Sequence, residues 1–228
     1  MKGDALLLSR VIAGGRVQFI IPVYQRNYSW LTENCNQLFN DLVDLVHSGR
    51  PTHFFGSIVT SPADGYGINR LVIDGQQRLT TISLLLLAGI HAVENGELEG
   101  DRGSIEEAKE EFLMAKFSGT ERKIKLVPIE NDLEAYDRIF QHDVDNYVKD
   151  SKMTRNYQYF YERLTKEPRQ LSFDSLLSAI ERLQIISIEL DGNDQPQLIF
   201  ESLNSTGLDL TGADEVRNYL LMSLTAEE

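Results

Sequence analysis

The segment from residue 70 to residue 88 constrains the fold more than any other part of the chain. It begins with a short apolar run, Leu71–Ile73, which is rich in β-branched residues and predicts a buried strand. Asp74-Gly75 interrupts this run, because glycine allows a backbone turn that other residues resist. The largely apolar residues after Gln76 predict a buried helix that lasts to about Val93. A buried strand therefore passes directly into a buried helix.

The turn between this strand and this helix has the residue types of an anion-binding site. A helix N-terminus carries free backbone N–H groups and a partial positive charge. Arg78 adds a permanently charged planar donor that suits phosphate, and Asp74 is able to hold a metal ion, order a water or accept from a ribose hydroxyl. The amides of Gln76 and Gln77 both donate and accept hydrogen bonds.

The same turn also has a purely structural interpretation. Asp-Gly is a common turn, and Asp74 can simply cap the helix that follows. The segment is neither a Walker sequence nor a glycine-rich dinucleotide loop. Spacing alone therefore leaves a ligand site and a helix cap as alternatives.

Three longer motifs occur along the chain, at residues 21–30, 74–81 and 200–221. They are Ile-Pro-Val-Tyr-Gln-Arg-Asn-Tyr-Ser-Trp, Asp-Gly-Gln-Gln-Arg-Leu-Thr-Thr, and a segment that begins Phe-Glu-Ser-Leu-Asn-Ser-Thr-Gly. In sequence, order and rough spacing they resemble the N-terminal domain of GmrSD-type, modification-dependent restriction enzymes. The resemblance implies an α+β, ParB/sulfiredoxin-like fold, in which a small mixed sheet has flanking helices and a helical insertion. It also implies binding of nucleoside triphosphates, with hydrolysis as a further activity.

The resemblance also implies an organisation of the chain and a set of site residues. We expect a ParB-like core formed by residues 1–95 and 184–228, interrupted by a mainly helical insertion at 96–183. The implied catalytic residues are Asp74, Gln77 and Arg78, and Asp74 is also the implied ligand of Mg²⁺. The implied nucleotide-binding residues are Gln25, Arg26, Tyr28, Gly56, Ser57, Gly75, Gln76, Thr80, Asn204, Ser205, Thr206 and Gly207.

Structural alternatives apply to several of these residues. Residues 23–30 combine an arginine, two amides, two tyrosines and the only tryptophan, a mixture that can stack on a base, donate to phosphate or form an aromatic plug. We interpret Trp30 as a packing residue. Gly56 within a predicted strand marks a bulge or a close backbone approach. Residues 204–207 have the composition of a helix end followed by a turn, since Gly207 suits a left-handed cap.

The remaining sequence alternates between predicted strands and helices. Strands are expected at residues 17–21, 53–60, 123–129 and 184–190, and helices at 6–13, from Thr32 or Asn34 onward, 132–141, 156–164, 173–183, 196–203 and near the C-terminus. The loop at 62–69 is typical of a hairpin connection. The aromatic residues at 157–161 have helical spacing and are expected to pack in a core.

Composition limits the classes of function. The formal net charge is −13, from 22 basic and 35 acidic residues, which argues against broad binding to DNA phosphates. If DNA is the target, we expect other parts of the full-length protein to supply much of the contact. The single cysteine, Cys35, has no disulfide partner and is expected to be packed, which fits a reducing cytoplasm. No apolar run reaches the ~20 residues that span a bilayer, so we expect no membrane contact.

Three functional hypotheses follow from the sequence. The first is a nucleotide-binding regulatory domain of a restriction or phage-defence enzyme, coupled to a nuclease domain or subunit of the His-Asn-His type. The second is a nuclease in its own right, although the four histidines do not form a His-Asn-His arrangement. The third is a non-catalytic sensor of modified DNA.

Overall fold

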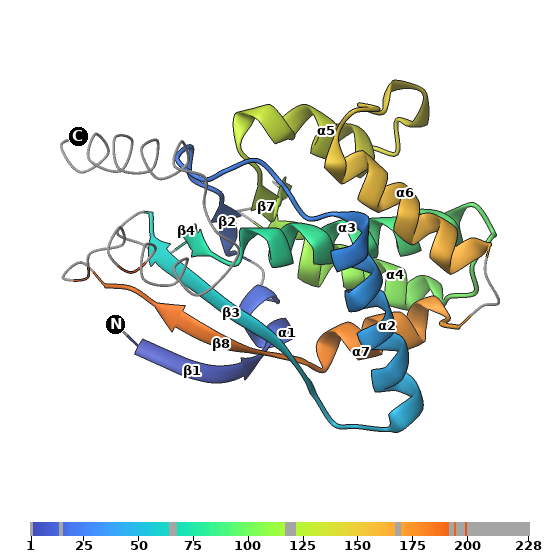
Figure 1. Cartoon of the computed structure of the whole chain (residues 1–228), viewed down its shortest axis with the longest axis horizontal. Helices are drawn as coiled ribbons and strands as arrows, with labels where there is room; N and C mark the ends of the chain where they lie inside the picture. The colour runs from blue at the N-terminus through green and yellow to red at the C-terminus, as the bar shows by residue number, and fades with distance from the viewer. Residues whose placement is uncertain are drawn as a thin grey trace.

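The computed structural model describes residues 2–13, 16–63, 68–116, 122–166 and 170–191, together with Asp194 and Ile199. Within these residues the chain forms a mixed six-stranded sheet, in the order β1-β8-β3-β4-β2-β7, and a two-stranded sheet of β5 and β6. The strands gather on one side of the molecule, and α2, α4, α6 and α7 gather on the other (Figure 1). The expected α+β class is confirmed.

The large sheet combines parallel and antiparallel pairs. β3 pairs in parallel with β8 and antiparallel with β4, while β2 pairs in parallel with both β4 and β7, and β1 is antiparallel to β8. The strands are β1 (Lys2–Leu7), β2 (Gln18–Ile20), β3 (His53–Pro62), β4 (Asn69–Asp74), β5 (Met114–Lys116), β6 (Arg122–Ile124), β7 (Leu126–Val127) and β8 (Leu183–Glu189). The antiparallel β3–β4 pair confirms the predicted hairpin connection.

The helices surround one long central helix, α3 (Gln76–Glu94). The others are α1 (Leu8–Ile12), α2 (Thr32–Ser48), α4 (Arg102–Ala108), α5 (Glu130–Phe140), α6 (Lys152–Thr165) and α7 (Phe173–Glu181), with a π-helical turn at Lys109–Leu113 and a 3₁₀ turn at Val144–Asn146. Most predicted helices are confirmed, with ends shifted by a few residues. None of the helices in the described ranges is long and apolar enough to cross a membrane.

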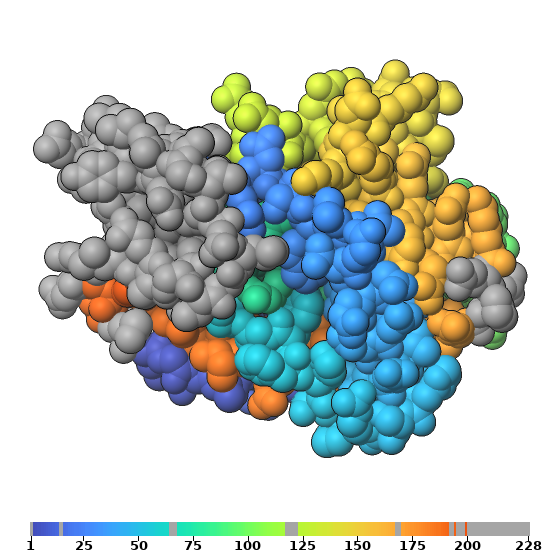
Figure 2. Space-filling view, viewed as in Figure 1, coloured from blue at the N-terminus to red at the C-terminus, as the bar shows by residue number. Residues whose placement is uncertain are grey.

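Helix α3 lies at the centre, and nearly all of its surface is buried. Its residues from Leu79 to Ala92 are buried, and it packs against α5, α6 and α7. A single core cluster includes residues from α1 and α3, from the expected insertion, and from β8. On one face of the molecule α2 and α6 lie side by side (Figure 2), where Tyr159 Oη donates to Asn36 Oδ1 at 2.7 Å. Residues 96–183, which we expected to form a helical insertion, therefore share one core with the sheet, and they also supply its strand β7.

Two sequence predictions need correction. The expected helix at residues 6–13 is preceded by strand β1, which ends at Leu7 and is imposed by pairing with β8. The expected strand at 123–129 is split into β6 and β7 by Lys125. The Lys125 ammonium is buried and donates to the backbone oxygens of Ile12, at 2.9 Å, and Glu111.

Several packing predictions are confirmed. Cys35 is fully buried, and burial raises the pKa of its thiol to about 12, so it is a core residue. Trp30 packs at the edge of the main core, and Tyr157 and Phe160 of α6 are buried in it. The helices expected at 196–203 and near the C-terminus lie outside the described residues.

Candidate functional site

The junction between β4 and α3 depends on a glycine. Gly75 has a φ of +96°, and a Cβ built there would lie 3.0 Å from both the Ser57 carbonyl oxygen and Ile58 Cγ1. Only glycine fits this backbone conformation and this close approach to β3. Gly75 is also the N-cap residue of α3, so no side chain caps the first turn of the helix. The turn predicted from Asp74-Gly75 is confirmed.

Three polar groups meet beside this junction. Ser57 Oγ donates to Asp74 Oδ2 at 3.2 Å, and Arg78 Nη1 donates to the Ser57 carbonyl oxygen at 3.2 Å. Arg78 Nη1 also lies 3.8 Å from Asp74 Oδ2, and the two side chains are 31% and 25% exposed. The structure therefore brings Asp74, Ser57 and Arg78 together, with the carboxylate and the guanidinium both reaching solvent.

Gly56 belongs to the same cluster through a distortion of β3. The β3–β8 register shifts between Phe54 and Gly56, and Gly56 has a φ of +117°. A Cβ built on Gly56 would lie only 2.5 Å from Arg78 Nε and 2.8 Å from Arg78 Cζ. The guanidinium thus lies directly over the glycine, and the bulge and close approach predicted at Gly56 are confirmed.

The glutamines of the motif face the protein interior. Gln76 Nε2 donates to Gln25 Oε1 at 2.9 Å, and Gln25 Nε2 donates to the Ile73 carbonyl oxygen at 2.8 Å. Both side chains are buried. This chain of amides ties the segment after β2 to the end of β4. Their hydrogen-bonding groups are consequently engaged within the protein.

Gln77 holds the same irregular segment further along. Its Oε1 accepts from the backbone N–H groups of Ser29, at 2.8 Å, and Trp30, at 3.1 Å. Its Nε2 donates to the Asn27 carbonyl oxygen at 3.4 Å. Gln77 is 9% exposed. Gln77, which the sequence suggested as catalytic, thus anchors the backbone of the irregular segment between β2 and α2.

Tyr28 continues this anchoring into the helical insertion. Thr81 Oγ1 donates to the Gln77 carbonyl oxygen, so it accepts from the Tyr28 hydroxyl, at 2.8 Å. Asn156 of α6 donates to the same hydroxyl at 3.0 Å. Burial raises the pKa of Tyr28 well above its usual range, so the hydroxyl stays protonated. Thr80 is buried one residue earlier in α3.

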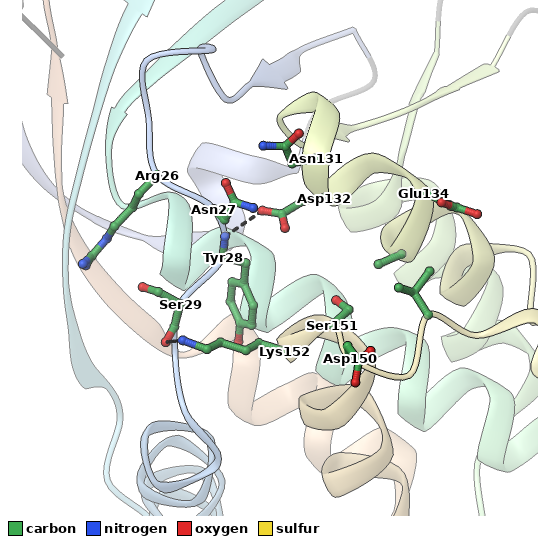
Figure 3. A pocket seen from close by; sticks show the side chains of 12 residues that line it. Arg26, Asn27, Tyr28, Ser29, Asn131, Asp132, Glu134, Asp150, Ser151 and Lys152 are labelled. Atoms are coloured by element: carbon green, nitrogen blue, oxygen red, sulfur yellow. Dashed lines mark hydrogen bonds between the residues drawn. The ribbon is translucent and has the colours of Figure 1, made fainter. Parts of the chain in front are cut away.

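A cavity of about 580 Å³ opens on the other side of the Tyr28 segment. It is bordered by this segment, by α5 and by the start of α6. Figure 3 shows the Lys152 side chain extending to Ser29, whereas Arg26 extends away from Asp132 and Asp150. The lining residues are Arg26, Asn27, Tyr28, Ser29, Asn131, Asp132, Glu134, Ala135, Val148, Asp150, Ser151 and Lys152.

Two charged residues of this cavity contact the Tyr28 segment and were not among the sequence candidates. Asp132 Oδ2 accepts from the Tyr28 backbone N–H at 2.6 Å, and burial raises the pKa of its carboxyl group. Lys152 Nζ donates to the Ser29 carbonyl oxygen at 3.4 Å. Both belong to the helical insertion, far away in sequence. No local signal could have identified them, because a carboxylate in the first turn of a helix is commonplace.

The candidate residues therefore separate into three groups. Asp74, Arg78, Ser57, Gly56 and Gly75 form one partly exposed cluster, which we call the junction cluster. The buried anchors are Gln25, Tyr28, Gln76, Gln77 and Thr80, and Arg26 lines the cavity. Asn204, Ser205, Thr206 and Gly207 lie outside the described residues.

The junction cluster has the donor set that Mg²⁺ with a triphosphate requires. Mg²⁺ is usually bound by one or two carboxylates together with phosphate oxygens and waters. Asp74 supplies one partly exposed carboxylate, and Arg78 supplies a guanidinium that suits phosphate oxygens. The cluster therefore fits the expected group.

Fold and cluster together define an α+β domain with a polar strand-to-helix junction at its central helix. A family model described as the N-terminal domain of the GmrSD restriction endonuclease matches residues 7–221, and the chain belongs to this family. The resemblance recognised from the three motifs is thereby confirmed. Among curated proteins, none matches the chain.

Proposed function

We propose that this chain is the nucleoside-triphosphate-binding regulatory domain of a modification-dependent restriction or phage-defence endonuclease. Membership of the GmrSD N-terminal domain family supports the role in restriction. The junction cluster supports the binding of phosphate. We further propose that DNA is engaged through the full-length protein and cut by a His-Asn-His-type nuclease domain or subunit.

The single observation that carries this proposal is the pairing of Asp74 with Arg78 at the start of α3. The two side chains are four residues apart, face the same side, and both reach solvent. The first turn of α3 begins at a glycine and so has no side-chain cap. A phosphate oxygen placed there would accept from backbone N–H groups and from Arg78.

Each residue of the junction cluster has a distinct part in the proposed site. Arg78 binds phosphate oxygens, and Gly56 leaves room for its guanidinium. Asp74, oriented by Ser57, is the residue that would hold Mg²⁺, which neutralises phosphate charge when bound. Gln77 acts as a positioning residue, since its hydrogen bonds hold the segment at Ser29 and Trp30.

Binding of triphosphates tests the proposal directly. We would titrate the purified protein with ATP, GTP, CTP and UTP, each with and without Mg²⁺, by isothermal calorimetry. We expect saturable binding of at least one triphosphate, weakened at least about tenfold by Asp74→Ala or Arg78→Ala, since each removes a charged contact. Arg102→Ala, at an exposed position that begins α4, is the matched control. Equal binding by all variants would contradict the proposal.

The cavity beside Tyr28 supports a second candidate function, a sensor of modified DNA. Its volume of about 580 Å³ falls in the range of small-molecule sites. Arg26, Lys152 and the nearby acidic side chains offer donors and acceptors for a base that has been flipped out of its helix. A titration with modified and unmodified DNA distinguishes this candidate, because a sensor binds the modified form more tightly in the absence of nucleotide.

Nuclease activity of the isolated chain is the remaining hypothesis. Incubation of the purified chain with supercoiled plasmid and Mg²⁺ tests it. We expect no cleavage. Cleavage that is lost in Asp74→Asn would instead assign the chemistry to the junction cluster.

A further inference from the structure

Two histidines and a glutamate meet at the C-terminal end of α3. His91 and Glu94 belong to this helix, and His142 lies just after α5. One potential ligand atom from each of the three residues lies within 4.8 Å of the other two. His91 follows Arg78 by 13 positions on the same helix, which is about 20 Å along its axis. This group, which we call the histidine cluster, is therefore separate from the junction cluster.

His91 is oriented in the way that metal-binding histidines usually are. Its side chain is buried, with an exposed fraction of 4% for the residue, and its Nδ1 lies 2.9 Å from the Tyr157 hydroxyl of α6. A metal-binding histidine typically uses its second ring nitrogen for such an outer hydrogen bond, which fixes the ring. Because Tyr157 holds Nδ1, Nε2 is the nitrogen that we expect to bind a metal.

His142 is held against His91 by an uncommon backbone conformation. Its φ is +54°, in the left-handed region that residues other than glycine rarely adopt. The two imidazole rings are stacked, with centroids 4.0 Å apart and planes 2° apart. Burial, then the proximity of His142 and of Lys109, lowers the pKa of His91 to about 3, so this imidazole is neutral at neutral pH. Neutral imidazole is the form that binds metals.

We propose that His91, Glu94 and His142 bind a divalent transition-metal ion of the Zn²⁺ type, which joins the end of α3 to the turn after α5. Two imidazole nitrogens and a carboxylate are a known ligand set for Zn²⁺ with three protein ligands and an open fourth position. Mg²⁺ and Ca²⁺ prefer oxygen ligands, so they fit the cluster less well. The proposal does not depend on the nucleotide site.

The required change in geometry is small. Ligand atoms around a tetrahedral Zn²⁺ lie about 3.3 Å apart, given bonds of about 2.0–2.2 Å. The ligand atoms, which lie within 4.8 Å of one another, must therefore approach by no more than about 1.5 Å, and the His142 ring must turn out of its parallel stack on His91. Glu94 is exposed and His142 is half-buried, so both side chains have room to move.

Lys109 competes with an ion for the glutamate. Its Nζ lies 2.6 Å from Glu94 Oε1, and both side chains are partly exposed. An ion at the cluster must take Glu94 from this pair. Removing the lysine should therefore tighten metal binding, whereas a purely structural role for the histidines predicts no such gain.

Zinc binding by tag-free, chelator-treated protein tests the proposal. We would titrate ZnCl₂ into the protein by isothermal calorimetry, and follow Co²⁺ by the visible absorption of a four-coordinate ion. We expect one Zn²⁺ per chain and a zinc-dependent rise in Tm. His142→Asn, which keeps a residue tolerant of positive φ, and Glu94→Gln should each weaken binding at least about tenfold. Lys109→Gln should tighten it, by up to about fivefold.

The other two histidines of the chain provide the matched control. The double variant His47→Ala/His53→Ala leaves only His91 and His142, since the sequence has four histidines, and should bind zinc like the unaltered protein. The Tm of each metal-free variant shows whether it is folded. If His142→Asn unfolds, zinc binding by Glu94→Gln tests the proposal instead, because Glu94 is exposed. Absence of stoichiometric binding, unchanged affinity in Glu94→Gln, or loss of binding only in the double variant would overturn the proposal.

Discussion

The two ends of α3 use their buried polar residues in different ways. At the start of the helix, Gln76 and Gln77 are buried and hold the segment after β2, while Asp74 and Arg78 remain partly exposed. At its end, His91 is buried against Tyr157 and stacked on His142. Both ends carry a partly exposed charged pair, Asp74–Arg78 at the start and Glu94–Lys109 at the end. The buried polar groups differ: amides at the start hold a neighbouring segment of backbone, and an imidazole at the end is enclosed by aromatic rings.

The comparison shows that the residues of one short motif have different roles. In Asp-Gly-Gln-Gln-Arg, the inner amides are structural, and the outer Asp74 and Arg78 are the groups that reach solvent. The strand-to-helix junction explains the division. Asp74 ends β4 and Arg78 lies in the first turn of α3, and both contact Ser57 of β3, whereas Gln76 and Gln77 bond to the segment after β2. Residues of one motif therefore carry different expectations for mutation.

The largest expected effect is the dependence of stability on pH, which arises from His91 at the C-terminal end of α3. His91 has a pKa of about 3 in the folded protein and 6.5 as its reference value, so the unfolded state binds more protons between these values. The contribution of the neutral His91 imidazole to stability is therefore fully present above pH 6.5 and is lost as the pH falls toward 3. Between pH 7 and 4.5, with chelator present, the free energy of unfolding should fall by about 2.5 kcal/mol more than in His91→Phe. Urea unfolding at both values measures this, and His47→Ala should behave like the unaltered protein.

The second effect tests the structural role of the inner amides. Gln77→Ala removes the acceptor for the N–H groups of Ser29 and Trp30. Because these groups are only partly accessible to water, we expect a loss of about 2 kcal/mol in the free energy of unfolding. Gln37→Ala, at an exposed glutamine of α2, should change it far less. A Gln77→Ala protein as stable as the unaltered protein would contradict the structural role assigned to the buried amides.

The third effect tests the space under Arg78. In Gly56→Ala, the new Cβ would collide with the Arg78 guanidinium, and alanine disfavours a φ of +117°. We expect a loss of about 1.5 kcal/mol in stability together with weaker triphosphate binding. Gly49→Ala is the control for backbone strain alone, since Gly49 has a φ of +66° and its Cβ would meet no atom within 4 Å. Unchanged triphosphate binding in Gly56→Ala would contradict a contact between Arg78 and the triphosphate.

The smallest effect concerns the link from the motif to the helical insertion. Tyr28→Phe removes the hydroxyl between Thr81 and Asn156 while it keeps the buried ring. We expect a loss of about 1 kcal/mol by thermal unfolding. Tyr161→Phe, which removes a more exposed hydroxyl, should have a smaller effect. Similar losses of stability in the two variants would mean that the hydrogen bonds of the Tyr28 hydroxyl contribute no more than those of an exposed hydroxyl.

The parts of the fold that sequence could predict are local. The junction of β4 with α3 follows from an apolar run, a glycine and a change of period, all within neighbouring residues. Strand β1 was missed, because Gly3 and Asp4 have low strand propensity and the strand exists through its pairing with β8. The split at Lys125 was missed because its ammonium binds carbonyl groups more than ten residues away along the chain.

The candidate site shows the same limit. Asp74 and Arg78 could be placed at the same strand-to-helix turn, and Gly56 could be recognised as a close approach but not matched to Arg78. The contacts of Asp132 and Lys152 with the Tyr28 segment come from folding of the insertion against it. Such contacts between distant residues depend on tertiary packing, which no local pattern records.

The most direct test of the central claim is an experimental structure with a non-hydrolysable triphosphate and Mg²⁺. We expect phosphate oxygens within hydrogen-bonding distance of Arg78 and of the first N–H groups of α3, with the ion bound by Asp74. A triphosphate bound elsewhere, with Asp74 and Arg78 still paired only to each other and Ser57, would contradict the assignment of the junction cluster.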